Sequence, residues 1–239
     1  MLYAILAAGE GSRLAQEGCE VPKPLVRIQG ETLIGRLIRI FIANDATRII
    51  VITNARNATT QKFLRELSLP IPLDIVVQDT PSSMHSLYAI SDRLATEERF
   101  CLTTVDTIFL EEEFAHYINT FCCSQFDGLM AVTTYVDDEK PLYVQTATDL
   151  AIIGFYDTQE EHCQHVSGGI YCLTRQALDT LSRCIAEGKA RMRNFQRQLV
   201  SDGLQLRAYP FSKIIDVDHC TDIPKAEALV KDFAVTSSK

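Results

Sequence analysis

The sequence predicts an α/β fold in which a mostly parallel, mixed sheet carries helices on both faces, giving three layers (αβα). Apolar runs of strand length alternate with stretches whose apolar residues recur at helical spacing. The first run, Leu2–Ala8, is apolar throughout, as expected for a strand buried on both faces. With 239 residues, 46% of them hydrophobic, the chain can bury a large core.

The elements of the first half follow one another regularly. Each predicted strand is a short, mainly apolar run: Leu2–Ala8, Arg48–Thr53, Leu73–Gln78, Phe100–Thr104 and Leu129–Thr134. Helical spacing predicts helices between them at Thr32–Ala43, Thr59–Leu69, Ser82–Leu94 and Glu111–Phe121. This order is typical of a Rossmann-like sheet, in which ligands bind beyond the carboxyl ends of the strands.

The second half, from about residue 135, has shorter strands. They are predicted at Leu142–Thr146, Ala151–Tyr156, Gly169–Leu173, Gln205–Tyr209 and Lys213–Val217, with helices at Ala177–Ala186, Asn194–Val200 and Pro224–Phe233. No linker rich in Pro, Gly or Ser separates the halves, so we expect a single domain over 1–233 with halves at about 1–134 and 135–233. Residues 234–239 are expected to form a frayed tail.

Composition excludes several classes of protein. The formal net charge of -8 argues against a nucleic-acid partner. No basic leader precedes the first strand and no apolar run could span a bilayer, so we expect neither a signal peptide nor a membrane partner. The eight cysteines include no C-x-x-C pair, which argues against zinc and indicates free thiols. We therefore expect a cytoplasmic protein, and a homo-oligomer is compatible with these observations.

A glycine-rich turn leaves the first strand. Gly9 and Gly11 allow a left-handed backbone and let a ligand approach the main chain. The turn lacks the P-loop pattern, and Leu14 stands where a dinucleotide-binding turn has its third glycine. Arg13 lies inside the turn and Lys23 follows between two prolines, so backbone amides and two fixed cations form a receptor for a polyphosphate.

The run Gly9-x-Gly11-Ser12-Arg13-Leu14, followed by Pro22-Lys23-Pro24-Leu25-Val26, resembles the signature of nucleotidyltransferases of the sugar-1-phosphate type, the nucleoside-diphosphate-sugar pyrophosphorylases. Similarity continues at lower strength to about Val230. The resemblance implies an enzyme of sugar-nucleotide biosynthesis that joins a nucleoside triphosphate to a sugar 1-phosphate or similar small phosphomonoester and releases pyrophosphate. The first half would bind the nucleotide and the second half the acceptor.

The resemblance assigns roles to residues of the first half. Arg13 would contact the leaving pyrophosphate, because arginine can hold phosphate oxygens with two donors at once. Lys23 would neutralise the transferred α-phosphate and the incoming phosphomonoester, with its backbone restricted by the flanking prolines. The residues expected to bind the nucleotide are Ala8, Gly9, Glu10, Gly11, Ser12, Ser83 and, reading the base, Gln78.

The resemblance also implies a Mg²⁺ site. Asp106, just after the strand Phe100–Thr104, resembles one metal-binding aspartate, and Asp216 resembles the second. Asp218 is the second choice, because residues two apart on a strand point to the same face. The alternatives are a helix cap at Asp106 and a polar strand end at Asp216 and Asp218.

Acceptor contacts are less defined. Gly168 and Gly169 resemble the strand where glycine lets the acceptor sugar approach, although two glycines also suit a bulge. The family's acidic-lysine-proline element is missing upstream of this strand, and Glu139-Lys140-Pro141 lies too early in the chain. Arg191 and Arg193 would either bind an anionic acceptor or lie solvated at a helix start.

Several functional alternatives stay open. The base is undetermined, and a phosphocholine-type cytidylyltransferase is one alternative. A non-catalytic module that binds nucleotide or sugar nucleotide is another, since the segment 82–86 lacks the glycines of many relatives. Pyrophosphate release separates this module from the enzyme. A nicotinamide-dependent oxidoreductase is remote, because no acidic residue near Thr53 could hold a ribose.

Overall fold

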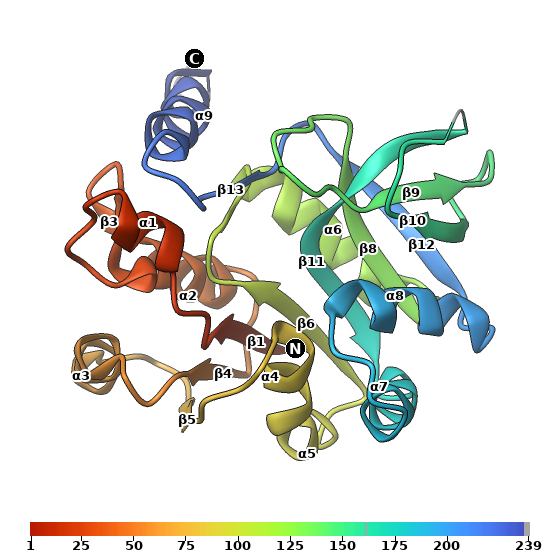
Figure 1. Ribbon diagram of the computed structural model, residues 1–239, viewed down its shortest axis with the longest axis horizontal. Coiled ribbons are helices and arrows are strands. Elements are labelled where there is room, and N and C mark those ends of the chain that lie inside the picture. The colour runs from red at the N-terminus through yellow and green to blue at the C-terminus, as the bar shows by residue number, and fades with distance from the viewer. Residues whose placement is uncertain (161, 237–239) are drawn as a thin grey trace.

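The computed structural model describes residues 1–160 and 162–236 and contains a nine-stranded main sheet and two small two-stranded sheets (Figure 1). The parallel part of the main sheet runs in the order β6 (Arg99–Thr104), β1 (Leu2–Ala7), β4 (Arg48–Thr53) and β5 (Leu73–Val77), with β5 at the edge. Antiparallel pairing beyond β6 adds β11 (Cys163–Thr174), β9 (Tyr143–Thr146), β10 (Ile152–Tyr156) and β8 (Gly128–Thr133). Finally, β12 (Leu206–Phe211) runs parallel to β8.

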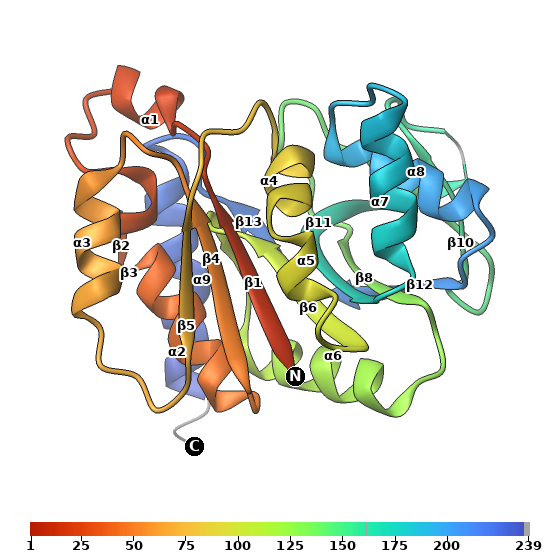
Figure 2. The same cartoon turned by 90° about the horizontal axis from the view of Figure 1, so that it is seen from below.

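The alternation of side chains along β1 separates two apolar layers. Tyr3 and Ile5 face a layer shared with α2 (Leu33–Ala43), α3 (Ala58–Glu66) and α6 (Glu111–Cys123). Leu2 and Ala4 face the opposite layer, covered by α4 (Ser83–Ala89), α5 (Ser91–Leu94), α7 (Ala177–Ala186) and α8 (Met192–Ser201) (Figure 2). The predicted three-layer fold with a mixed sheet is confirmed. Among the described residues, no helix combines the length and apolar character needed to cross a membrane.

A third apolar cluster lies beyond the carboxyl end of β1. Its buried members include Leu14, Val26, Ile108, Ile215 and Ala226. These residues lie in or next to short elements from both ends of the chain. The early ones are α1 (Ser12–Gln16), the 3-10 helix η1 (Lys23–Leu25) and the hairpin of β2 (Arg27–Ile28) with β3 (Glu31–Thr32). The later ones are β7 (Thr107–Ile108), which pairs with β13 (Ile215–Asp216), and α9 (Asp222–Thr236). This cluster brings the glycine-rich turn next to the last part of the chain.

Some predicted boundaries are wrong. The helix expected at Ser82–Leu94 is divided at Ile90, whose backbone leaves the helical region (φ -110°, ψ 3°). The strand expected at Gly169–Leu173 already begins at Cys163, and the strand expected at Lys213–Val217 shortens to β13, which pairs outside the main sheet. Helix α9 continues to Thr236, into the segment 234–239 expected as a tail, and residues 237–239 lie outside the described part.

A bulge in β11 contains the two glycines singled out by the sequence. The pairing of β11 with β8 shifts register between Ser167 and Tyr171. Gly169 has φ 74°, a conformation that side chains disfavour. A methyl group on Gly168 would overlap Cδ1 of Ile214 and lie 3.3 Å from the carbonyl oxygen of Ala131. Gly168 therefore allows β11 to pack closely against the segment that leads into β13.

We predict that Gly168→Ala lowers the free energy of unfolding by about 1–3 kcal/mol, because the core must absorb the overlap with Ile214. Ile214→Val removes the overlapping Cδ1 methyl, so the double variant should be more stable than the sum of the single changes predicts. Urea unfolding of the four proteins measures this coupling. Strictly additive losses would show that the overlap does not govern the site.

Candidate active site

The glycine-rich turn lies between the end of β1 and the start of α1. Gly11 has a left-handed backbone (φ 62°, ψ 30°). A Cβ atom at this position would lie only 2.8 Å from Cβ of Lys23. Glycine therefore allows η1, which contains Lys23, to pack directly against the turn. The backbone amides of the turn and the lysine are held together by the fold itself.

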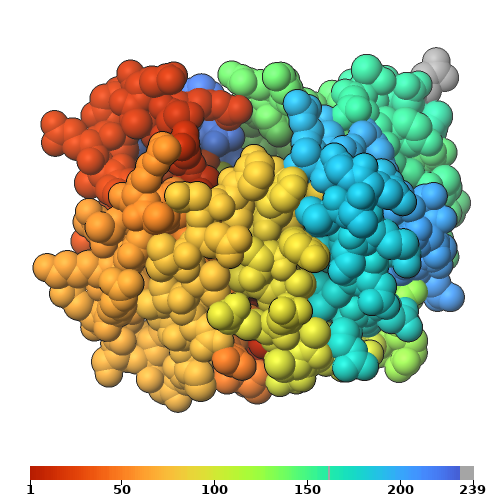
Figure 3. Space-filling view, turned by 60° about the horizontal axis from the view of Figure 1, so that its bottom comes forward, coloured from red at the N-terminus to blue at the C-terminus, as the bar shows by residue number. Residues whose placement is uncertain are grey.

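A main cleft of about 600 Å³ lies at the carboxyl ends of β1 and β6, within the volume range typical of small-molecule sites. Figure 3 shows two of the segments that line it, with the glycine-rich turn in red and the α4 segment in yellow. Residues that the sequence singled out and that line the main cleft are Ala8, Gly9, Glu10, Gly11, Ser12, Arg13, Lys23, Ser83, Asp106 and Asp218.

The segment from Thr80 to Ser86 forms the wall opposite the turn. The hydroxyls of Thr80 and Ser86 lie 2.6 Å apart, and Ser82 caps α4 by accepting a hydrogen bond from the main chain of His85. Ser83, predicted to bind the nucleotide, lines the main cleft together with the hydroxyl side chains around it. Gln78, in contrast, is exposed beyond the edge strand β5 and does not line the main cleft.

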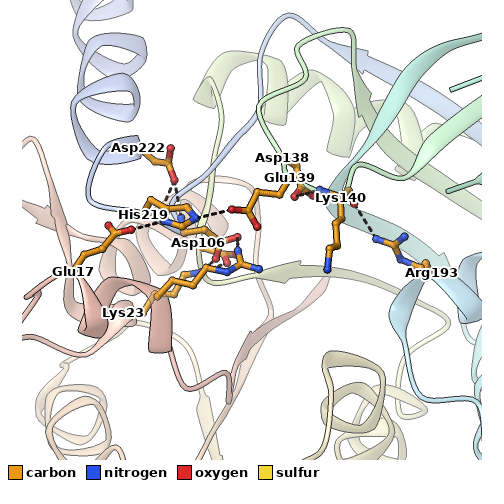
Figure 4. A network of polar contacts seen from close by, with 11 residues as sticks. Glu17, Lys23, Asp106, Asp138, Glu139, Lys140, Arg193, His219 and Asp222 are labelled. Atoms are coloured by element: carbon orange, nitrogen blue, oxygen red, sulfur yellow. Dashed lines mark hydrogen bonds and ion pairs between the residues drawn. The ribbon is translucent and has the colours of Figure 1, made fainter. Parts of the chain in front are cut away.

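A lysine–carboxylate cluster lies at one end of the main cleft (Figure 4). The ammonium of Lys23 donates to Asp106 and, at 2.6 Å, to Oδ1 of Asp218. Arg13 Nη1 donates to Oδ2 of Asp218 at 2.8 Å. The Lys23 side chain is only 10% exposed, whereas Arg13 is about half exposed. The fold thus brings both predicted cations and two predicted carboxylates to one place.

Asp216 lies beside this cluster, at the end of β13. Its main chain pairs with Thr107 of β7. Because β13 ends at Asp216, the strand face expected to present both Asp216 and Asp218 does not form. Asp218 is held by its main-chain N–H, which donates to Oδ2 of Asp222 at 3.1 Å. Asp216 therefore approaches the cluster from the end of β13, and Asp218 approaches it from the irregular segment that follows.

A side pocket of about 330 Å³ adjoins the main cleft. Ser82, Ser83, Thr104 and Asp106 line both. The other residues that line the side pocket are Asp138, Lys140, Leu142, Ser167, Gly169, Tyr171, Arg191, Met192, Arg193, Gln196 and Asp216. Gly169 lines the side pocket, whereas Gly168 packs against Ile214 and does not line it. Acceptor binding at either glycine stays a prediction.

Comparison with known proteins agrees with this geometry. Residues 3–202 match the MobA-like NTP transferase domain. The chain belongs to this family. The resemblance inferred from the sequence is thereby confirmed at the level of the family.

Individual relatives are distant. The bifunctional IPC transferase and DIPP synthase of Rubrobacter xylanophilus is 24% identical to this protein over 98% of the chain and 53% of that relative. The chain spans at most about half the length of the curated relatives it matches.

Two solved structures share the fold. The inositol-1-phosphate CTP transferase of T. maritima has a TM-score of 0.79 at 17% identity, covering 97% of this chain and 96% of that one. A protein assigned as a glucose-1-phosphate thymidylyltransferase of Bacillus anthracis has a TM-score of 0.84 at 19% identity, with the same coverage.

The charges in the candidate site are unevenly balanced. Burial alone would raise the pKa of Asp106, but the Lys23 ammonium outweighs burial and lowers it. Burial would lower the pKa of Lys23, but the carboxylates of Asp106 and Asp218 outweigh burial and raise it. For Asp216, burial and the negative charges of Asp106 and Asp218 together raise the pKa to about 8. One further positive charge would therefore stabilise the ionised site.

Two carboxylate oxygens in the site are suited to bind a cation. Oδ1 of Asp106 and Oδ1 of Asp216 are buried, and neither has a hydrogen-bond partner among the described residues. Such oxygens are costly to bury unpaired, and hard divalent cations prefer oxygen ligands. Within residues 1–160 and 162–236, no group of three or more His, Cys, Asp or Glu residues forms a complete metal site. The two aspartates therefore fit a metal that takes further ligands from water or substrate.

We predict that Asp216→Asn alters the pH dependence of stability in chelator-treated protein. The folded protein retains the Asp216 proton up to about pH 8, whereas the ordinary pKa is 3.8. Rising pH therefore destabilises the parent across this window, by up to about 1.4 kcal/mol per pH unit. The asparagine variant should gain stability relative to the parent between about pH 5 and pH 8 in urea unfolding. The exposed Asp92→Asn is the control, and an unchanged difference between variant and parent would contradict the prediction.

Proposed function

We propose that this protein transfers a nucleoside monophosphate from a nucleoside triphosphate to a small phosphomonoester and releases pyrophosphate. The observation that supports this most directly is the junction of the main cleft and the side pocket at Asp106. Each substrate has a pocket of its own, and the two reacting phosphates would meet at the shared wall. Such an arrangement holds the reactants in line and reduces the entropic cost of their encounter.

The triphosphate belongs in the main cleft beside the glycine-rich turn. Backbone N–H groups of residues 9–12 are suited to phosphate oxygens, and the left-handed Gly11 supports such a turn. Arg13 would contact the β- and γ-phosphates, since its guanidinium is half exposed and its partner Asp218 can be exchanged for phosphate. Lys23 would contact the α-phosphate, because its ammonium lies next to Asp106 where the two pockets meet.

We assign Mg²⁺ to Asp106 and Asp216, whose unpartnered oxygens fit a hard cation. Members of the family generally use a divalent metal. When bound, this ion would neutralise phosphate charge and raise the electrophilicity of the α-phosphorus. Asp218 remains the second choice, because both its oxygens already accept hydrogen bonds from Lys23 and Arg13. Asp106 and Asp218 also keep the Lys23 ammonium oriented.

The side pocket favours a phosphorylated polyol or sugar as the acceptor. Asp138, Ser167 and Gln196 offer hydrogen-bonding groups for hydroxyls. Tyr171 is the one aromatic residue among the described residues that line the pocket, which argues against an aromatic cage for phosphocholine. The relative in Rubrobacter is named an IPC transferase and the T. maritima structure an inositol-1-phosphate CTP transferase. CTP with inositol 1-phosphate is therefore the first substrate pair to test.

The reaction needs no covalent intermediate. An oxygen of the acceptor phosphate attacks the α-phosphorus, a new phosphorus–oxygen bond forms, and the bond between the α-phosphorus and the bridging oxygen of the β-phosphate breaks. Pyrophosphate leaves on the side of Arg13. The contributions of Arg13 and Lys23 are positional and electrostatic, since their charges face the oxygens where negative charge gathers.

The experiment is a matrix of common triphosphates against inositol 1-phosphate, glucose 1-phosphate and phosphocholine, read by pyrophosphate release with Mg²⁺. We expect turnover with at least one pair and a loss of about 10²–10³-fold in kcat for Asp106→Asn. The exposed Asp92→Asn should match the parent. Nucleotide binding without pyrophosphate release from any pair would favour a non-catalytic module instead.

A further inference from the structure

Two threonine hydroxyls lie beside the carboxylates to which the metal is assigned. Thr104 is the last residue of β6, and Thr107 is the first residue of β7. Their Oγ1 atoms are 2.7 Å apart, so one hydroxyl donates a hydrogen bond to the other. Thr107 is only 1% exposed, whereas Thr104 is partly buried and lines both the main cleft and the side pocket. These two side chains are here called the threonine pair.

Each member of the threonine pair is close to one of the two carboxylates. The main chain of Thr107 pairs with that of Asp216 in the ladder of β7 with β13. Burial raises the pKa of Asp216, and the nearby Thr107 hydroxyl opposes that rise. Burial would also raise the pKa of Asp106, but the Lys23 ammonium and the nearby Thr104 hydroxyl lower it. Each hydroxyl therefore lies where it stabilises the ionised form of one aspartate.

The glycine bulge in β11 leaves room for the threonine pair. A Cβ atom on Gly169 would lie 3.2 Å from Oγ1 of Thr107 and 3.3 Å from Oγ1 of Thr104. The same point is 3.9 Å from Oδ1 of Asp216, a buried oxygen without a hydrogen-bond partner among the described residues. A side chain at position 169 would press on both hydroxyls, so glycine allows the main chain of β11 to cover the pair closely.

The number of hydrogens limits what the threonine pair can do. Each hydroxyl supplies one donor, and the bond within the pair uses one of the two. A single donor is therefore left to point outward, from Thr104 toward Asp106 or from Thr107 toward its own aspartate. Hydrogen bonds of this outer kind orient the carboxylates that bind a metal, and the loss of one typically weakens metal binding by about 10–100-fold.

We infer that the threonine pair holds the carboxylates of Asp106 and Asp216 in the orientation that binds the divalent cation. This inference rests on the proposed function, because it concerns the metal site assigned there. Both threonines are positioning residues, since each acts through a carboxylate. Gly169 contributes to the same arrangement by leaving space for the two hydroxyls.

The test uses Mn²⁺ as the probe, because binding removes the paramagnetic resonance signal of the free ion. The ion is titrated with and without α,β-methylene CTP, each against a protein-free blank. Thr104→Val and Thr107→Val remove one hydroxyl each, and each should raise the Kd for Mn²⁺ by about 10–100-fold. Thr104→Ser and Thr107→Ser should recover most of this loss, since the hydroxyl returns. The double valine variant should bind little more weakly than either single variant, because each change breaks the same bridge.

Thr180→Val is the matched control. Thr180 is also 1% exposed, and its hydroxyl donates to a carboxylate, Oδ2 of Asp202, at 2.6 Å. It lies in α7 and lines neither the main cleft nor the side pocket. This variant should have a lower thermal midpoint and an unchanged Kd for Mn²⁺. A merely structural role for the threonine pair would make its valine variants behave like this control.

Asp106→Asn separates the failure of this inference from that of the proposed function. If this variant loses Mn²⁺ affinity while both valine variants bind like the parent, the role of the threonine pair is wrong and the metal site stands. If Asp106→Asn also binds like the parent, or the parent binds no Mn²⁺ in either titration, this inference fails together with the metal assignment. Pyrophosphate release in the substrate matrix then decides the transfer reaction separately.

Discussion

One ammonium group, that of Lys23, joins three distant parts of the chain. It extends from η1 next to the glycine-rich turn, and its partners Asp106 and Asp218 follow β6 and β13. Charges this far from water are tolerated only when they are paired, and removing one partner leaves the others uncompensated. The contact therefore fixes the relative positions of the turn, the main sheet and the last segment. The positive charge that nucleotidyl transfer requires is in place before substrate arrives.

Short sequence patterns were enough to predict the part of the candidate site whose residues are close together in the sequence. The turn and the 3-10 helix that follows it contain Gly11, Arg13 and Lys23, which are close together in the sequence. The positive φ of Gly11 and its close approach to Lys23 explain why this spacing is needed. Asp106 could also be predicted, because the carboxyl ends of adjacent parallel strands meet at one edge. The fold class followed from the alternation of strand and helix patterns, which reflects burial on two faces.

The remaining features depend on register and on the paths of loops, which no short pattern encodes. Gln78 lies beyond an edge strand and is exposed, while the hydroxyl-rich segment after it lines the main cleft. Gly168 is required by a side chain, Ile214, that is far away in sequence. Glu139-Lys140-Pro141 was judged too early in the chain to contact the acceptor, yet β9 pairs with β11 and Lys140 lines the side pocket. Order along the chain was a poor guide to order in space.

The ladder of β7 with β13 has a consequence for biosynthesis. All nine strands of the main sheet are complete by Phe211, whereas Asp216 and Asp218 come afterwards. A chain that ended just after Phe211 would contain every strand of the main sheet but neither aspartate. It would also lack Ile215, Val217 and Ala226, which pack in the third apolar cluster. Complete synthesis of the last segment is therefore needed for the proposed metal site, although the strands of the main sheet are all made before it.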